Sequence, residues 1–124
     1  MSHSFGIESF NYDCTGNMHP FWNEFIELDL ELKHFNGFDD KGESLGYEEY
    51  NVNKKGIKAL NNLKGHEAIP VIKEFFVRCR NYRSNLGGDY DSPNGWGTVE
   101  VCIVLMGQLL VDCIENPYKE IWVN

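Results

Sequence analysis

Apolar and charged residues alternate from Ile26 to Lys33. In a strand, side chains at alternate positions point to opposite faces of the sheet. One face would then carry Ile26, Leu28, Leu30 and Leu32, and the other Glu27, Asp29, Glu31 and Lys33. The pattern therefore predicts a half-buried antiparallel strand over this segment.

A helix is the alternative for the same segment. Phe21, Phe25, Leu28 and Leu32 recur at helical spacing, and Pro20 would fall in the first turn, where proline is tolerated. This helix would leave Leu30 on its polar side, so a strand is the preferred interpretation.

Turn-forming residues follow the alternating segment. Asn36-Gly37 and Asp39-Asp40-Lys41-Gly42 supply turn chemistry before a second strand-like run from Leu45 to Val52. The two runs predict a hairpin with a long acidic tip.

The rest of the chain adds two short strands and two long helices. Val71, Phe75, Cys79 and Tyr82 recur at helical spacing after Pro70, and a mostly apolar segment that starts near Thr98 stops before Asn116-Pro117. Its few polar positions predict a central helix that is covered on most sides. The expected segments are a strand at 5–12, a loop at 13–20, a loop with a short helix at 53–65, a helix from 70 to about 84, a glycine- and aspartate-rich loop at 85–95, a helix from about 98 to 115 and a strand at 120–123.

These elements predict an α+β fold. We expect an antiparallel sheet of about four strands, packed on one face by two main helices, with residues 1–124 forming a single domain.

Charge is distributed unevenly along the chain. The net charge is -8, and the first fifty residues hold eleven acids against Lys33 and Lys41. Such a field repels nucleic acid and anionic membranes and attracts cationic partners. Acidity that serves only solubility is the alternative explanation.

The location of the protein is also suggested by the sequence. There is no basic and apolar leader and no apolar run of membrane-span length, so we expect a cytoplasmic protein. The four cysteines form no CxxC pair, which favours reduced core thiols, although their even number leaves a disulfide open.

Catalytic and metal-binding patterns are weak. His3, His19, His34 and His66 lie in separate segments, and no phosphate-binding or nucleophile motif is present. We therefore expect neither an enzyme, a cofactor nor a metal site. The alternative is a small metal-dependent hydrolase that uses Asp89 and Asp91, whose spacing is a fragment of a calcium loop.

Acidic groups on segments expected to face solvent are the best candidates for a binding site. They comprise the strand face Glu27, Asp29 and Glu31, the hairpin tip Asp39, Asp40 and Glu43, and the loop Asp89, Tyr90 and Asp91.

Four parts of the chain resemble small bacterial immunity proteins of contact-dependent and other polymorphic toxin systems. They are the segment from Asn94 to Glu100, the apolar helix after it, Glu115-Asn116-Pro117 and the hairpin from Phe25 to Val52. The resemblance implies a cytoplasmic protein, without enzymatic activity, that binds and neutralises a cognate toxin domain. If the toxin is a basic nuclease, the acids above would pair with its Lys and Arg while Tyr90 acts as an apolar anchor. For Trp96, a buried position at the helix start is the preferred expectation.

Overall fold

The computed structural model describes residues 2–124, with side chains described except at 2–3, 29–35 and 48–54. Short 3-10 helices at Gly16–Met18 and Ile57–Leu60 connect longer elements. The strands and α-helices are, in chain order, β1 (Ser2–Ile7), β2 (Phe10–Thr15), α1 (His19–Phe25), β3 (Glu27–Phe35), β4 (Tyr47–Lys55), α2 (Gly65–Asn81), α3 (Leu86–Tyr90), α4 (Val99–Glu115) and β5 (Ile121–Val123).

The strands form two separate sheets. β1 lies between β2 and β5 in a three-stranded antiparallel sheet, while β3 pairs only with β4 among the described strands. The α+β class is confirmed, but the expected sheet of about four strands is replaced by a three-stranded sheet and a separate hairpin.

The first strand of the chain was expected to run from Phe5 to Tyr12. The chain instead turns back at Glu8 and Ser9, so this segment contributes to both β1 and β2. Glu8 has a φ of 54°, a backbone conformation that hairpin turns require and that non-glycine residues adopt rarely. This turn lacks the Asn-Gly or Asp-Gly pair that marks many hairpins, so it could not be predicted from the local residues.

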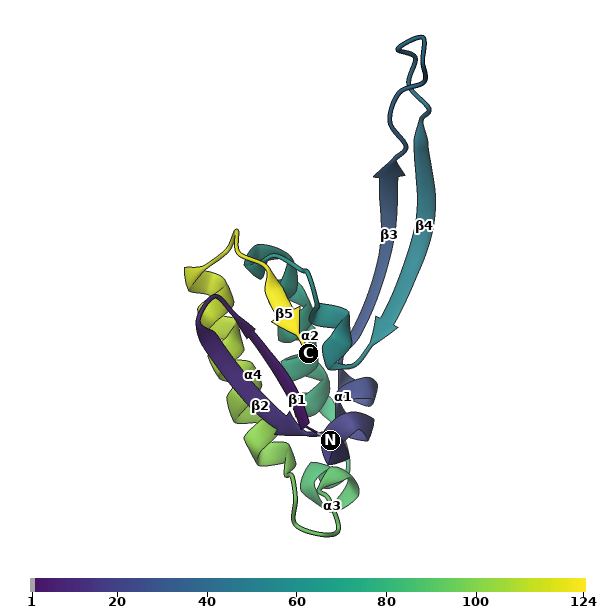
Figure 1. The fold of residues 1–124 in the computed structure, drawn as a ribbon. Coiled ribbons are helices and arrows are strands. Elements are labelled where there is room, and N and C mark those ends of the chain that lie inside the picture. The colour runs from purple at the N-terminus through teal and green to yellow at the C-terminus, as the bar shows by residue number, and fades with distance from the viewer. Residues whose placement is uncertain (1) are drawn as a thin grey trace.

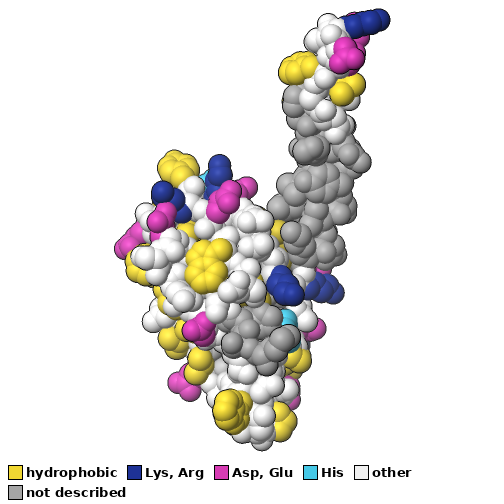
Figure 2. All heavy atoms as spheres, viewed as in Figure 1, with side chains coloured by type: hydrophobic (Ala, Val, Ile, Leu, Met, Phe, Trp, Pro, Cys, Tyr) yellow, Lys and Arg dark blue, Asp and Glu magenta, His cyan; other side chains and the backbone are white. Residues whose placement is uncertain are grey.

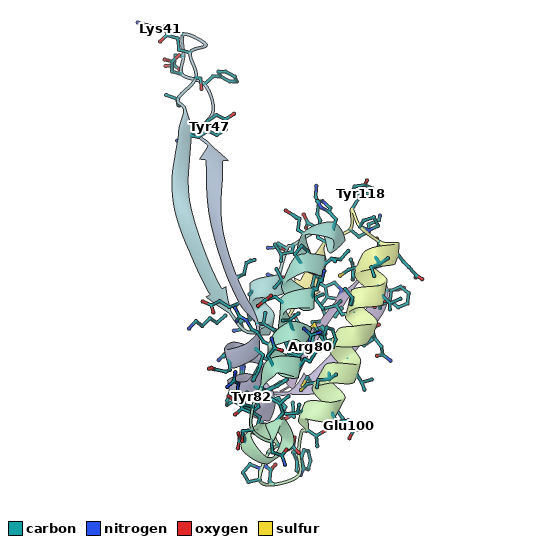
Figure 3. The ribbon with its side chains drawn as sticks, turned by 180° about the vertical axis from the view of Figure 1, so that it is seen from behind. Lys41, Tyr47, Arg80, Tyr82, Glu100 and Tyr118 are labelled. Carbon is teal, nitrogen blue, oxygen red and sulfur yellow. The ribbon has the colours of Figure 1, made fainter. Side chains whose placement is uncertain are left out.

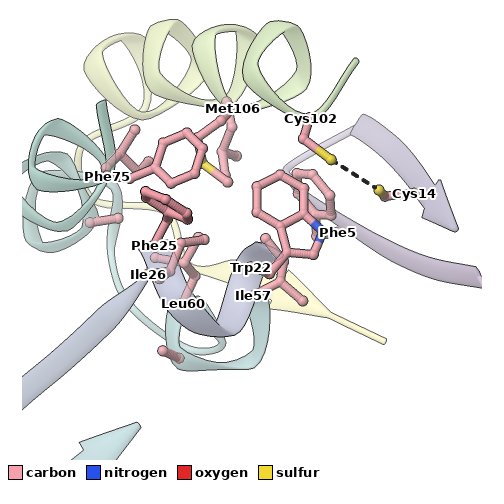
Figure 4. Packing of buried hydrophobic residues seen from close by; sticks show 14 of the residues in the cluster. Phe5, Cys14, Trp22, Phe25, Ile26, Ile57, Leu60, Phe75, Cys102 and Met106 are labelled. Carbon is pink, nitrogen blue, oxygen red and sulfur yellow. Dashed lines mark hydrogen bonds between the residues drawn. The ribbon is translucent and has the colours of Figure 1, made fainter. Parts of the chain in front are cut away.

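The helices α2 and α4 pack side by side behind the three-stranded sheet (Figure 1). The core between them is rich in aromatic rings, which Figure 4 shows at close range. Phe21 of α1 lies 5.7 Å from Phe75 of α2, centroid to centroid, and Trp22 of α1 lies 6.3 Å from Phe5 of β1. α1 thus joins the sheet to the helices.

Both interpretations of the alternating segment were correct in part. Pro20 lies in the first turn of α1, but this helix ends at Phe25 and β3 begins at Glu27. The apolar face of the strand is buried at its start, where Ile26 and Leu28 are 1% and 7% exposed.

The hairpin projects from the rest of the molecule as an arm, with β3 and β4 paired from Glu27 and Lys55 at the base to Phe35 and Tyr47 at the far end (Figure 1). Gly56 allows the base to approach α1, because a Cβ there would lie 2.2 Å from the side-chain oxygen of Asn23. Two strands alone are of marginal stability in water, so contacts at the base stabilise the arm.

The boundaries of α2 differ from expectation at both ends, whereas α4 begins where expected. α2 begins at Gly65, five residues before Pro70, because the Glu67 side chain accepts a hydrogen bond from the backbone N–H of Lys64 at 2.9 Å and caps the first turn. α2 ends at Asn81, slightly earlier than expected. α4 begins after Thr98, as expected, and the Thr98 hydroxyl accepts from the backbone N–H of Val101.

α4 was expected to be covered on most sides, and this was wrong. Val101, Val104, Val111 and Ile114 are between 52% and 58% exposed. The opposite face, with Cys102, Met106 and Leu109, is fully buried. α4 is therefore an outer helix of the described structure with an apolar outer face.

Candidate interaction surfaces

The tip of the arm, residues 36–46 with Tyr47, combines acidic and apolar side chains. Phe38, Leu45 and Tyr47 are 66%, 56% and 65% exposed, and Asp40 and Glu43 are also exposed. In Figure 2 apolar and acidic side chains gather at the far end of the arm, where a basic side chain also projects. Large exposed apolar side chains on one small loop are typical of protein-binding surfaces.

Asp39 has a structural role within the tip. Its Oδ1 accepts hydrogen bonds from the backbone N–H of Lys41 at 2.9 Å and of Glu43 at 2.8 Å. The carboxylate therefore orders the turn, as aspartate commonly does in loops. Asp40 and Glu43 are left as the acids of the tip that a partner can contact.

The acids at the base of the arm are in a different environment. The Glu27 carboxylate lies 3.5 Å from the guanidinium of Arg78, which also contacts Glu74 of its own helix at 3.4 Å. The side chains of Asp29 and Glu31 lie outside the described residues.

The acids near α3 are engaged within the chain. Asp89 accepts a hydrogen bond from the Tyr82 hydroxyl at 2.5 Å, and this bond raises the pKa of Tyr82 above its ordinary value. Asp91 accepts from the backbone N–H of Val99 at 2.8 Å and so caps the start of α4. The expected loop at 85–95 contains the short helix α3, which the sequence did not indicate.

Tyr90 also packs inward. Its ring lies 5.7 Å from Phe21 and 5.5 Å from Phe25 in edge-on contacts, so it is half-buried against the aromatic core. The residue that was predicted to anchor a partner thus contributes to the core of its own chain.

The predicted acids do not form one surface. Figure 3 shows Lys41, at the tip of the arm, and Tyr82, the partner of Asp89, toward opposite ends of the molecule. The base of the arm lies between them (Figure 1). A partner that contacts the tip therefore meets a different set of side chains from one that contacts α3.

Trp96 was expected to be buried, and this was wrong, because its side chain is 72% exposed. The backbone around it is held in place: Asn94 Oδ1 accepts from the Trp96 N–H at 2.9 Å, and the Asn17 side chain donates to the Trp96 carbonyl at 3.2 Å. Gly97, with a φ of 123°, lies where a Cβ would be 2.5 Å from the methyl group of Thr15. The close approach at glycine anchors the loop, and the indole points outward.

The cysteines are all free. Cys14 of β2 and Cys102 of α4 are buried with their sulfur atoms 3.8 Å apart (Figure 4). The hydrogen bond that the two thiols share lowers the pKa of Cys14 and raises the pKa of Cys102. Burial raises the pKa of Cys79 and of Cys113 to about 11.

Within the described part of the chain, no three His, Cys, Asp or Glu side chains are grouped so as to hold a metal ion. None of the described helices is long and apolar enough to span a membrane. No family model, curated protein or solved structure matches the chain.

Proposed function

We propose that this chain is a bacterial immunity protein that binds and neutralises a cognate toxin domain, and that the tip of the arm makes the main contact. The carrying observation is the set of exposed apolar side chains Phe38, Leu45 and Tyr47 beside Asp40 and Glu43 at the end of a projecting hairpin. The resemblance of the segments at 25–52 and 94–100 to immunity proteins gives the class of partner.

The chemistry of the tip suits a basic toxin site. A nuclease must attract phosphates, so its active site is positively charged, and carboxylates can occupy the same site. Apolar side chains next to the acids exclude water and strengthen each charge pair. A narrow arm can reach into a concave site that a flat surface cannot enter.

The first test is neutralisation of the toxin domain encoded beside this chain. Co-expression of the two should restore growth, and the purified proteins should form a complex. If the unaltered chain neither binds that toxin nor restores growth, the proposed function is wrong.

The second test locates the contact. Asp40→Lys with Glu43→Lys should weaken the complex by about 30-fold or more, because losing one buried acid of an interface costs about 2–5 kcal/mol. Asp39 is left intact because it orders the turn. Glu115→Lys with Glu120→Lys is the matched control, since it changes the charge equally at exposed positions away from the tip.

The salt dependence of association gives an independent readout. The tip variant should associate more slowly and lose most of the acceleration seen at low ionic strength. The control should keep most of that acceleration, because its tip is unchanged. Equal weakening by the two double variants would show that net charge, and not the tip, determines binding.

A further inference from the structure

The outer face of α4 is unusual for an exposed helix. Val101, Val104 and Val111 are separated by three and seven residues and therefore lie along one side of the helix, and all three are about half exposed. Single exposed apolar residues need no explanation, but a row of them on one helix marks an interaction site.

A groove adjoins the N-terminal half of this face. It has a volume of about 430 Å³ and lies between α3 and the first turns of α4. Its walls carry the apolar side chains of Leu86, Val99, Ile103 and Val104 and the carboxylates of Asp91 and Glu100. Val104 belongs to both the groove and the exposed row, so the two form a continuous surface.

The charges at the groove are all of one sign. None of the eight described residues that line it is basic, and the bond from the Val99 N–H fixes the Asp91 carboxylate at its rim. Glu100 is exposed on the first turn of α4. An apolar groove bordered by carboxylates matches an apolar side chain next to a positive charge.

A second copy of this chain fits the surface poorly. The exposed charged side chains of α4 are Glu100 and Glu115, and the helix has no Lys or Arg. A symmetric dimer would place the same patch on both sides of the contact, so acids would face acids with no base from either helix to balance them.

We propose that the groove between α3 and α4 binds a segment of a partner protein in which an apolar side chain is flanked by Lys or Arg. The apolar side chain enters the groove against Ile103 and Val104, and the basic groups meet Glu100, while Asp91 keeps its bond to the Val99 N–H and adds to the negative charge at the rim. This inference stands apart from the proposed function, because the groove and the tip of the arm lie in different parts of the molecule (Figure 3).

A short synthetic peptide that repeats Lys-Leu-Leu-Lys is the probe. Titrated into the isotopically labelled chain, it should give saturable NMR shift changes concentrated on the amides of α3 and the first half of α4. Two analogues, one with Ser for each Leu and one with Glu for each Lys, should bind at least about tenfold more weakly, because each lacks one of the two matched features.

Matched variants on the same helix test the location. Val104→Lys, at the groove, should lower the affinity for the peptide by about tenfold or more, since it removes apolar contact and adds a positive charge that repels the lysines of the peptide. Val111→Lys is equally exposed on the same face but outside the groove, and should change binding less than about twofold. Glu100→Gln should reduce binding, with Glu115→Gln as its control, and thermal melts should confirm that all four variants fold.

Three results would overturn the inference. If the acidic analogue binds as tightly as the basic peptide, the charges at the groove do not determine binding. If Val104→Lys and Val111→Lys weaken binding equally, the peptide does not bind in the groove. Concentration-dependent dimerisation that Val104→Lys abolishes would assign the surface to a second copy. Because no toxin is used, none of these results bears on the proposed function.

Discussion

Replacing Tyr12 by phenylalanine should destabilise the fold more than the size of the change suggests. Asp112 of α4 is the buried acid among the described side chains, with 6% of its surface exposed. The Tyr12 hydroxyl of β2 donates a hydrogen bond to it, which joins the sheet to the helix. Tyr12→Phe keeps the ring and leaves the buried carboxylate without this donor.

A buried polar group that loses its partner costs about 1–3 kcal/mol, and more when charged. Asp112 also lies near the C-terminus of α4, where the helix dipole disfavours negative charge. We therefore expect Tyr12→Phe to lower the free energy of unfolding by about 1–3 kcal/mol, and Tm by about 3–5 °C for each kcal/mol in a chain of this length.

Urea unfolding followed by far-UV circular dichroism measures this loss. Adding Asp112→Leu to Tyr12→Phe should recover most of it, because replacing both members of a buried polar pair by apolar groups is close to neutral. A loss below about 0.5 kcal/mol in Tyr12→Phe, or a double variant less stable than that single variant, would refute the reasoning.

The same pair predicts a pH dependence with a definite sign. Burial, and then the hydrogen bond and negative charge of Asp112, raise the pKa of Tyr12 to about 12 from an ordinary value of 10.0. The folded state therefore holds this proton more tightly than the unfolded state. Its contribution to stability is complete below pH 10 and is lost as pH rises from about 10 to about 12, and Tyr12→Phe should not show this particular loss.

Three further predictions test the packing. Gly65→Ala should lower Tm, because its Cβ would lie 2.5 Å from a backbone carbonyl oxygen, whereas Gly107→Ala, whose Cβ would be 3.8 Å from its nearest neighbour, should be neutral or raise Tm. Trp96→Phe should remove the fluorescence that acrylamide quenches most readily without changing Tm by more than a few degrees, and an unchanged quenching curve would mean that this indole is covered. Diamide should join Cys14 to Cys102, which mass spectrometry after alkylation detects as the loss of two free thiols. Cys102→Ser should keep the Cys14 thiol free, and survival of both thiols in the unaltered chain would count against their proximity.

Long, regular patterns in the sequence predicted their elements well. The alternation from Ile26 to Lys33 identified β3, and the apolar run between Thr98 and Asn116 identified α4 with its ends. In both segments the side-chain period and the flanking turn or cap residues favour the same structure. Agreement between local signals is what makes such segments predictable.

Elements that depend on distant contacts were predicted poorly. The turn at Glu8 has no glycine or asparagine and was missed. α1 was considered only as the start of a longer helix, because its seven residues are too few for the helical period to show where it ends. α1 forms because Phe21 and Phe25 pack on rings that other elements supply, among them Tyr90. The sequence shows the aromatic residues but not which of them meet.

The sequence also does not show which carboxylates are available to bind a partner. Counting acids treats each carboxylate as available to a partner, yet Asp39, Asp89, Asp91 and Asp112 all accept hydrogen bonds from groups of their own chain. A carboxylate that already orders a turn, caps a helix or bridges two layers can turn toward a cationic partner only by weakening that bond, which reduces its net contribution to binding. Binding strength should therefore follow the acids that lack such a role in the fold, and the sharpest variants are those that alter them alone.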